Sequence, residues 1–280
     1  MGSRVIEAAQ LERFRNAMLE DEKSSATIAK YSRDVESFLA FAEGTEITKE
    51  VVIRYKQHLT EKYAPSSVNS MLAALNRFLK EIGRYDCVVK ALRIQRQAFR
   101  GKERELTKAE YYRLLDAARK KGDNRLYMLM QTICATGIRV SELRFITVEA
   151  LQRGRATVSL KGKTRQVLIP KALSKELTRY VKERGIKTGS IFVTSSGKPM
   201  DRSNILHRMK ALCETARVAK EKVFPHNLRH LFACLYYKME KDLSRLADLL
   251  GHSSLNTTRI YTSLSGAEQQ RQIDRLGLVL

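Results

Sequence analysis

Arginine, histidine and tyrosine side chains that could act on a phosphate group follow one another in the second half of the sequence. Planar guanidinium groups hold the non-bridging oxygens of a phosphate through paired hydrogen bonds. An arginine is otherwise most often a surface residue, but Arg139 lies in an apolar stretch where an unpaired charge would be costly. In chain order, the residues of interest are Arg139, His226, Arg229, His252 and Tyr261. Their types indicate a site that binds and acts on a phosphate.

Three short motifs contain these residues. The first is 135–143 (Ala-Thr-Gly-Ile-Arg-Val-Ser-Glu-Leu), the second is His226-Asn-Leu-Arg229, and the third is Leu-Leu-Gly-His252. Tyr261 stands nine residues after His252, and His252 stands 23 residues after Arg229. In these motifs and spacings the sequence resembles the tyrosine recombinase (phage integrase) family, specifically its compact, Xer-like members. The resemblance covers nearly the whole chain.

The resemblance implies site-specific cleavage and rejoining of duplex DNA. Tyr261 would attack a DNA phosphate, giving a 3′-phosphotyrosine and a free 5′-hydroxyl, so that the strand can be rejoined to a different partner. A tyrosine hydroxyl with a pKa of about 10 is a weak nucleophile, and the family's pattern makes His226 the acceptor of its proton. Arg139 and Arg229 would hold the phosphate, and His252 would hydrogen-bond to it.

A lysine in a β-hairpin is implied as the acid that protonates the leaving 5′-oxygen. Lys161 best matches the family's Lys-Gly turn and is preferred, while Lys163, expected on the turn itself, is the alternative. Both lysines could instead only contact phosphates or solvent. Nearby arginines would lower the pKa of such a lysine and so favour proton release. Glu142, three residues after Arg139 and on the same helical face, could orient that arginine.

A pair of histidines, one in the second motif and one directly after it, could also suggest a metal site. His226 and His230 are four residues apart, a spacing that can place two ligands on one face of a helix. No third ligand is evident in the sequence, and Arg229 between them would repel a cation. The sequence therefore predicts neither a metal ion nor another cofactor.

The charge of the chain points to nucleic acid as its partner. The 280 residues carry a formal net charge of +22, with a pI near 10.0, and such a positive field attracts polyanions. Residues 1–100 carry 17 Lys and Arg against 13 Asp and Glu, while residues 101–280 carry 35 against 17. DNA should therefore engage the second part most strongly. Ribosomal and membrane-surface proteins are equally basic, so charge names the partner and not the reaction.

Cysteine usage and hydropathy predict a cytoplasmic protein without membrane contact. The four cysteines are far apart and form no C-x-x-C pair, which is typical of reduced core thiols. No apolar run approaches the roughly 18 to 20 residues that span a bilayer, and the acidic N-terminus lacks the apolar core of a signal peptide.

The elements that must position the site residues are mainly helical. Apolar residues at helical spacing predict amphipathic helices over roughly 4–20, 26–43, 48–62 and 66–82. By resemblance these form a SAM-like core-binding domain. Further along, helices are expected at 111–118, 124–136, 171–184, 202–216, 227–239, 243–250 and 254–263, with strands at 156–160 and 166–169. The predicted fold class is thus mainly α, with a mixed catalytic domain that contains a small antiparallel sheet.

Four segments follow from these elements: an N-terminal helical domain (1–86), a basic linker (87–105), a catalytic domain (106–265) and a C-terminal segment (266–280). The catalytic domain opens with Thr107 and Glu110 at capping-box spacing. The linker could follow a phosphate backbone or could be a solvated connection without specific contacts. Its basic residues are Arg93, Arg96, Arg100, Lys102 and Arg104.

The resemblance also implies how the protein would assemble. Two domains would close as a C-shaped clamp on a specific duplex core site, with four protomers acting on two sites. The leucine-rich C-terminal segment would be exchanged between protomers or would pack on its own subunit. Accessory DNA-bending or directionality proteins are possible partners, and the outcome could be integration, excision, resolution or inversion. The rival interpretations are a non-catalytic DNA-binding protein and a type IB topoisomerase that relaxes supercoils.

Overall fold

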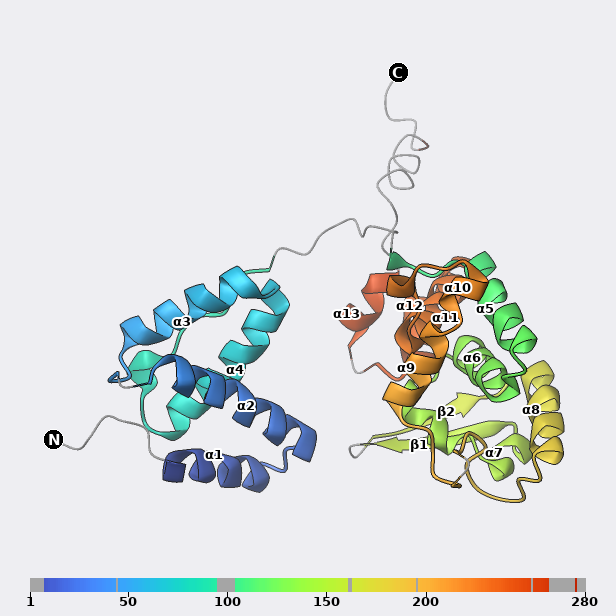
Figure 1. The fold of residues 1–280 in the computed structure, drawn as a ribbon, viewed down its shortest axis with the longest axis horizontal. Coiled ribbons are helices and arrows are strands. Elements are labelled where there is room, and N and C mark those ends of the chain that lie inside the picture. The colour runs from blue at the N-terminus through green and yellow to red at the C-terminus, as the bar shows by residue number, and fades with distance from the viewer. Residues whose placement is uncertain are drawn as a thin grey trace. The chain divides into compact units, whose positions relative to one another are not determined.

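The computed structural model describes residues 8–43, 45–94, 104–160, 163–194, 196–252, 254–261 and residue 275. The chain divides into two compact units, Met1–Arg96 and Gln97–Leu280, which run from blue to cyan and from green to red in Figure 1. Within the described ranges, no helix is long and apolar enough to cross a membrane.

The N-terminal unit is built from helices whose starts the sequence specifies. Ser24 and Thr48 accept backbone hydrogen bonds as N-caps, and Pro65 occupies the first helical turn, where its missing N–H costs nothing. The rings of Phe14 and Phe78 form a T-shaped pair in the core, with their centroids 5.4 Å apart. The helices are α1 (Ala8–Glu20), α2 (Ser25–Phe41), α3 (Lys49–Lys62) and α4 (Pro65–Glu81), followed by a 3₁₀ turn, Tyr85–Cys87.

The start of the predicted linker belongs to this N-terminal core. Cys87 and Val89 are buried in it. Asn76 pairs with both backbone groups of Val89 through its side-chain amide, at 2.8 and 3.0 Å. Asn69 pairs in the same way with Leu92, at 2.9 and 2.7 Å. The expectation that a linker begins at residue 87 is therefore wrong, because the side chains of α4 satisfy the extended backbone that follows the 3₁₀ turn.

The second unit is mainly helical with a two-stranded antiparallel sheet, as the sequence predicts. The predicted capping box opens it: Thr107 accepts from the Glu110 N–H, and Glu110 accepts from the Thr107 N–H. The elements are α5 (Lys108–Lys120), α6 (Asn124–Thr136), a 3₁₀ helix Val140–Phe145, α7 (Val148–Gln152), β1 (Arg155–Leu160), β2 (Lys163–Leu168), α8 (Lys171–Glu183), α9 (Arg202–Lys210), α10 (Cys213–Ala216), α11 (Pro225–Glu240), α12 (Leu243–Leu250), α13 (Leu255–Thr258) and a 3₁₀ turn Arg259–Tyr261.

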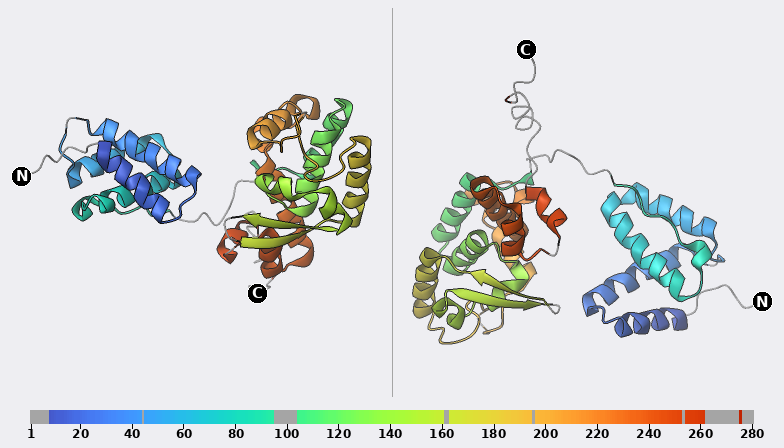
Figure 2. Two further views of the ribbon diagram at one scale, coloured as in Figure 1. Left: turned by 90° about the horizontal axis from the view of Figure 1, so that it is seen from below. Right: turned by 180° about the vertical axis from the view of Figure 1, so that it is seen from behind.

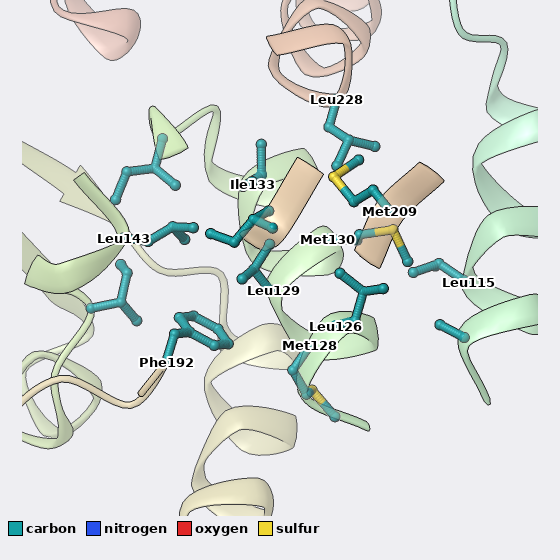
Figure 3. Packing of buried hydrophobic residues seen from close by; sticks show 14 of the residues in the cluster. Leu115, Leu126, Met128, Leu129, Met130, Ile133, Leu143, Phe192, Met209 and Leu228 are labelled. Carbon is teal, nitrogen blue, oxygen red and sulfur yellow. The ribbon is translucent and has the colours of Figure 1, made fainter. Parts of the chain in front are cut away.

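Helix α6 lies at the centre of this unit and packs against α5, α8 and α11. Figure 3 shows Leu129 and Ile133 of α6 among side chains from several elements, including Met209 of α9 and Leu228 of α11. Because these side chains are fully buried, the C-terminal end of α6 and the start of α11 are held in fixed positions. Both ends carry residues of the predicted site.

The hairpin starts its second strand earlier than predicted. Its register pairs Arg155 with Leu168 and Leu160 with Lys163. Lys163 is therefore the first residue of β2 and not part of the turn, because ladder pairing in a two-stranded ribbon does not require apolar side chains. Figure 2 shows the hairpin from two sides.

Two other predicted helices are interrupted. The expected helix 202–216 is divided into α9 and α10, and the expected helix 254–263 is the short α13 followed by a 3₁₀ turn that ends at Tyr261. The start of the first predicted helix, residues 4–7, lies outside the described residues.

Candidate active site

Arg229 is a deeply buried charge of the second unit. It lies in the first turns of α11, which begins at Pro225, and is 2% exposed. Its Nη1 donates to the carbonyl of Gly137 at 2.5 Å, and its Nη2 donates to the carbonyl of Leu250 at 2.7 Å. Burial lowers the pKa of Arg229 to about 10, with Arg139 adding to the effect. At neutral pH the group is still a cation.

Two helix ends supply the carbonyls that hold this cation. Helix α6 ends at Gly137 (φ +64°) and α12 ends at Gly251 (φ +62°), both left-handed. The C-terminal end of a helix is partly negative and favours a nearby cation. A Cβ at Gly137 would lie 2.5 Å from Phe232 Cδ1, and one at Gly251 would lie 2.2 Å from Arg165 Cδ. Glycine is needed at both positions by conformation and by space.

A buried carboxylate joins two further arginines to this site. Glu142 is 2% exposed. Its Oε1 pairs with Arg139 Nη1 at 2.8 Å, and its Oε2 pairs with Arg165 Nη2 at 2.6 Å. Burial by itself would raise the pKa of Glu142, but hydrogen bonds from Arg139 and the charge of Arg165 hold it below its usual value. Arg139 also donates to the carbonyl of Gly251 at 3.2 Å.

Arg165 is a residue of this cluster that the sequence analysis did not identify. From β2 it reaches Glu142 and donates through Nη1 to the carbonyl of Leu249 at 2.8 Å, so it ties the hairpin to the end of α12. Strand alternation could have identified it. Arg165 and Val167 are two residues apart and so share a face, and Val167 is buried. An arginine on the buried face of a strand needs a partner.

His252 and Tyr261 lie next to each other, and His252 contacts Arg229. The two rings stack with centroids 6.1 Å apart and planes 15° apart. His252 Nε2 lies 3.0 Å from Arg229 Nη2, and its Nδ1 lies 2.9 Å from Thr258 Oγ1. Burial lowers the pKa of His252 to about 4, and the positive charges of Arg229, Arg139 and Arg165 add to the effect.

Tyr261 is 5% exposed and belongs to a small apolar cluster with Ala233, Leu246 and Leu250. Burial raises the pKa of its hydroxyl above the ordinary value near 10, although Arg229 opposes the shift. In the free protein the phenol is therefore neutral and shielded from water.

Only some of the other predicted site residues lie among the residues that the structure describes. His226 is exposed on the first turn of α11 and contributes to the lowered pKa of His252, so it lies within electrostatic range of the site. The backbone of Lys163 starts β2, and Lys161 lies outside the described residues. Of the basic linker residues, Arg93 and Arg104 are exposed. Arg96, Arg100 and Lys102, like the C-terminal segment 266–280 except Arg275, lie outside the described residues.

The donor set of the site fits an oxyanion and not a metal ion. Arg139, Arg165 and Arg229 converge on neighbouring carbonyls and one carboxylate, which gives the site an excess of positive charge. Over the part of the chain that the structure describes, no group of three or more His, Cys, Asp and Glu side chains could hold a metal. Such a site can bind a phosphodiester next to a tyrosine.

Comparison with protein families identifies the class of protein to which the chain belongs. Residues 104–268 match the phage integrase family, and residues 11–84 match the phage integrase N-terminal SAM-like domain. The chain therefore belongs to the phage integrase, or tyrosine recombinase, family. It is a tyrosine site-specific recombinase, an enzyme that cleaves and rejoins DNA.

Similar proteins extend over the full length of the chain. A tyrosine recombinase XerA from Pyrococcus furiosus is 29% identical over 286 residues, covering 100% of this chain and 98% of the relative. A crystal structure of XerA recombinase is 28% identical with a TM-score of 0.53, covering 97% and 99%. A lambda integrase tetramer bound to a Holliday junction has a TM-score of 0.74 at 18% identity, covering 90% and 76%, and shares the fold.

Proposed function

We propose that Tyr261 is the nucleophile of this recombinase and that Arg139, Arg229 and His252 bind the phosphate it attacks. The observation that carries the proposal is the packing of Tyr261 against His252 while His252 Nε2 lies 3.0 Å from Arg229. A nucleophile, a hydrogen-bonding ring and a guanidinium are thus direct neighbours, which supports a shared phosphate site for these three side chains.

The reaction divides into two proton transfers and one exchange of bonds. The Tyr261 oxygen forms a bond to phosphorus as the bond from phosphorus to the 5′-oxygen breaks. His226 takes the phenolic proton, and Lys161, or Lys163 as the alternative, gives a proton to the 5′-oxygen. The reverse attack by a 5′-hydroxyl rejoins the strand and frees Tyr261. Cofactors have no part in these steps.

The free protein needs a rearrangement before this reaction, because Tyr261 is buried and the arginines hold protein carbonyls. Arg139 keeps 39% of its side chain exposed, so it can meet an incoming phosphate first. Arg229 offers fewer free N–H groups and would have to share or exchange its carbonyl partners. The same rearrangement on DNA binding would expose the Tyr261 hydroxyl next to the bound phosphate.

The proposed partner is duplex DNA carrying a specific core site, bound by four protomers during strand exchange. The lambda integrase structure is described as a tetramer on a Holliday junction, and the net charge of +22 here supports an extensive phosphate interface. Arg93 and Arg104 are exposed and fit a backbone contact. Accessory DNA-bending or directionality proteins would act with the protein in the cytoplasm. Segment 266–280 would be exchanged between protomers or would pack on its own subunit.

A nicked suicide substrate tests the nucleophile. The DNA would come from genomic fragments selected by binding to the protein, and the product is a covalent adduct resolved by denaturing electrophoresis. Wild-type protein should form the adduct in the presence of a metal chelator, and Tyr261→Phe should form none while binding DNA with nearly the same affinity. Tyr112→Phe, a change at an exposed tyrosine, is the matched control. An adduct with Tyr261→Phe would overturn the assignment.

A further inference from the structure

Thr258 is a fully buried hydroxyl beside the proposed phosphate site. It ends the short helix α13 and is 0% exposed. Its Oγ1 lies 2.9 Å from Nδ1 of His252. It therefore contacts a proposed phosphate-binding side chain directly.

The contacts of His252 fix where its proton lies in the free protein. A guanidinium has only donors, so Nε2 of His252 must accept the hydrogen bond from Arg229 Nη2. The lowered pKa of His252 leaves the ring with one proton at neutral pH. That proton is then on Nδ1, and Nδ1–H donates to the hydroxyl oxygen of Thr258.

Binding a phosphate demands the opposite arrangement. Phosphate oxygens only accept hydrogen bonds at neutral pH, so His252 must present an N–H to them. Nδ1 faces the buried Thr258, which leaves Nε2 as the nitrogen available to the substrate once Arg229 turns to the same phosphate. With the proton on Nε2, the Nδ1 lone pair needs a donor, because an unpaired buried polar atom is costly.

A hydroxyl meets both demands because it can accept from Nδ1–H and can also donate to the Nδ1 lone pair. We propose that Thr258 is a positioning residue for the recombination reaction: it holds the His252 ring at Nδ1 in both tautomers, so that the proton can move from Nδ1 to Nε2 when the phosphate binds. This inference rests on the proposed role of His252 in phosphate binding.

Isosteric substitutions separate the hydroxyl from the shape of the side chain. Thr258→Val keeps the volume and removes both hydrogen-bonding capacities, while Thr258→Ser keeps them. On the suicide substrate at saturating DNA, Thr258→Val should form the adduct about 10-fold or more slowly, the size expected for an unmet buried hydrogen bond. Thr258→Ser should stay within about 3-fold of wild type. Thr257→Val, at the exposed neighbouring threonine, should change nothing.

A double-mutant cycle with His252→Ala shows whether Thr258 acts through the histidine. In the His252→Ala background, Thr258→Val should cause no further loss of rate. Equal losses in both backgrounds, or a wild-type rate for Thr258→Val, would overturn the Thr258 inference and leave the proposed function intact. A wild-type rate for His252→Ala would instead refute the proposed role of His252, and the inference would fall with it.

Nitrogen NMR of labelled histidine reads the tautomer directly and does not depend on the folding of Thr258→Val. His252→Gln identifies the signals by their loss. The free protein should show His252 protonated at Nδ1, and Tyr261→Phe bound to its DNA site should show it protonated at Nε2. An Nε2 proton in the free protein, or no change on DNA binding, would contradict the proposal.

Discussion

The two units of the molecule bury different kinds of side chain. In the described part of the N-terminal unit the buried residues are almost all apolar, and Ser32 is the buried polar exception. The catalytic unit buries a carboxylate, a guanidinium, an imidazole and several hydroxyl and amide groups: Thr132, Thr136, Glu142, Asn227, Arg229, His230 and Thr258. Apolar side chains stabilise the first unit by burial alone. Each buried polar group of the second unit needs a hydrogen-bonding partner, because its burial is otherwise unfavourable.

This difference separates stability from chemistry. Burying the charge of Arg229 costs desolvation energy, whereas burying a hydrophobic side chain does not. The hydrogen bonds to the carbonyls of Gly137 and Leu250 offset only part of this cost. A charge held in this way is already desolvated and oriented when a phosphate arrives. Substitutions of buried residues in the N-terminal unit should therefore mainly lower the free energy of unfolding. Those at the buried charges of the second unit should mainly lower the rate of DNA cleavage.

The largest effect is expected for Arg229→Ala. Removing a guanidinium from the proposed phosphate site should slow adduct formation by about 10²–10³-fold. The two freed carbonyls should also lower the free energy of unfolding by about 1–3 kcal/mol. Suicide-substrate kinetics and urea denaturation measure the two effects, with Arg33→Ala on an exposed face of α2 as the control. A near-normal rate would show that the buried charge is structural.

Phe78→Ala should give the reverse profile in the N-terminal unit. Deleting this fully buried ring should lower the free energy of unfolding by about 3–5 kcal/mol. The rate of adduct formation on bound DNA, measured below the melting temperature, should stay near the wild-type rate because the site lies in the other unit. A large rate loss on saturating DNA would mean that the N-terminal core also controls the chemistry.

Glu142→Gln should destabilise the catalytic unit by about 3 kcal/mol at neutral pH, since it leaves two arginines without their carboxylate. The folded-state pKa of Glu142 is lowered. The stabilisation that the Glu142 carboxylate gives the folded protein is therefore fully present above its unfolded-state pKa of about 4.3. It is lost as the pH falls through the lower folded-state pKa. Denaturation at a series of pH values should show the difference from wild type shrinking in that acid range. A constant difference would contradict the linkage.

The smallest effect is expected for Arg104→Ala at the start of the catalytic unit. If the exposed Arg104 contacts one phosphate, its loss should reduce the slope of log affinity against log salt by about 1. Binding titrations at several salt concentrations measure this slope, and Arg33→Ala again serves as the control. An unchanged slope would favour a solvated linker without specific contacts.

Local rules predicted much of the fold. Helices α6 and α12 have the predicted bounds, 124–136 and 243–250. The capping box of Thr107 and Glu110 is also formed. These features depend on residues within about four positions of each other, which is the range over which helix caps and helical periodicity act. The mainly helical fold class and the recombinase family were likewise predicted, and both are confirmed.

The sequence could not predict contacts that join distant segments. Arg165 meets the carbonyl of Leu249 across 84 residues, and Arg229 meets that of Gly137 across 92. The packing of Val89 on the N-terminal core was missed for the same reason, since it depends on hydrogen bonds from Asn76 of α4. The motifs and their spacing pointed to Arg139 and Arg229, but they did not point to Arg165 or to the carbonyl groups that each arginine contacts.

By itself the sequence determined the residue types of the site, their order, the helices that present them and the basic charge that favours DNA. Tertiary structure alone decided that Glu142 pairs with two arginines, that Thr258 meets His252, and that Tyr261 is buried in the free protein. The physical reason is that burial and hydrogen-bond direction depend on what packs around a side chain, and the packing partners come from all parts of the catalytic unit.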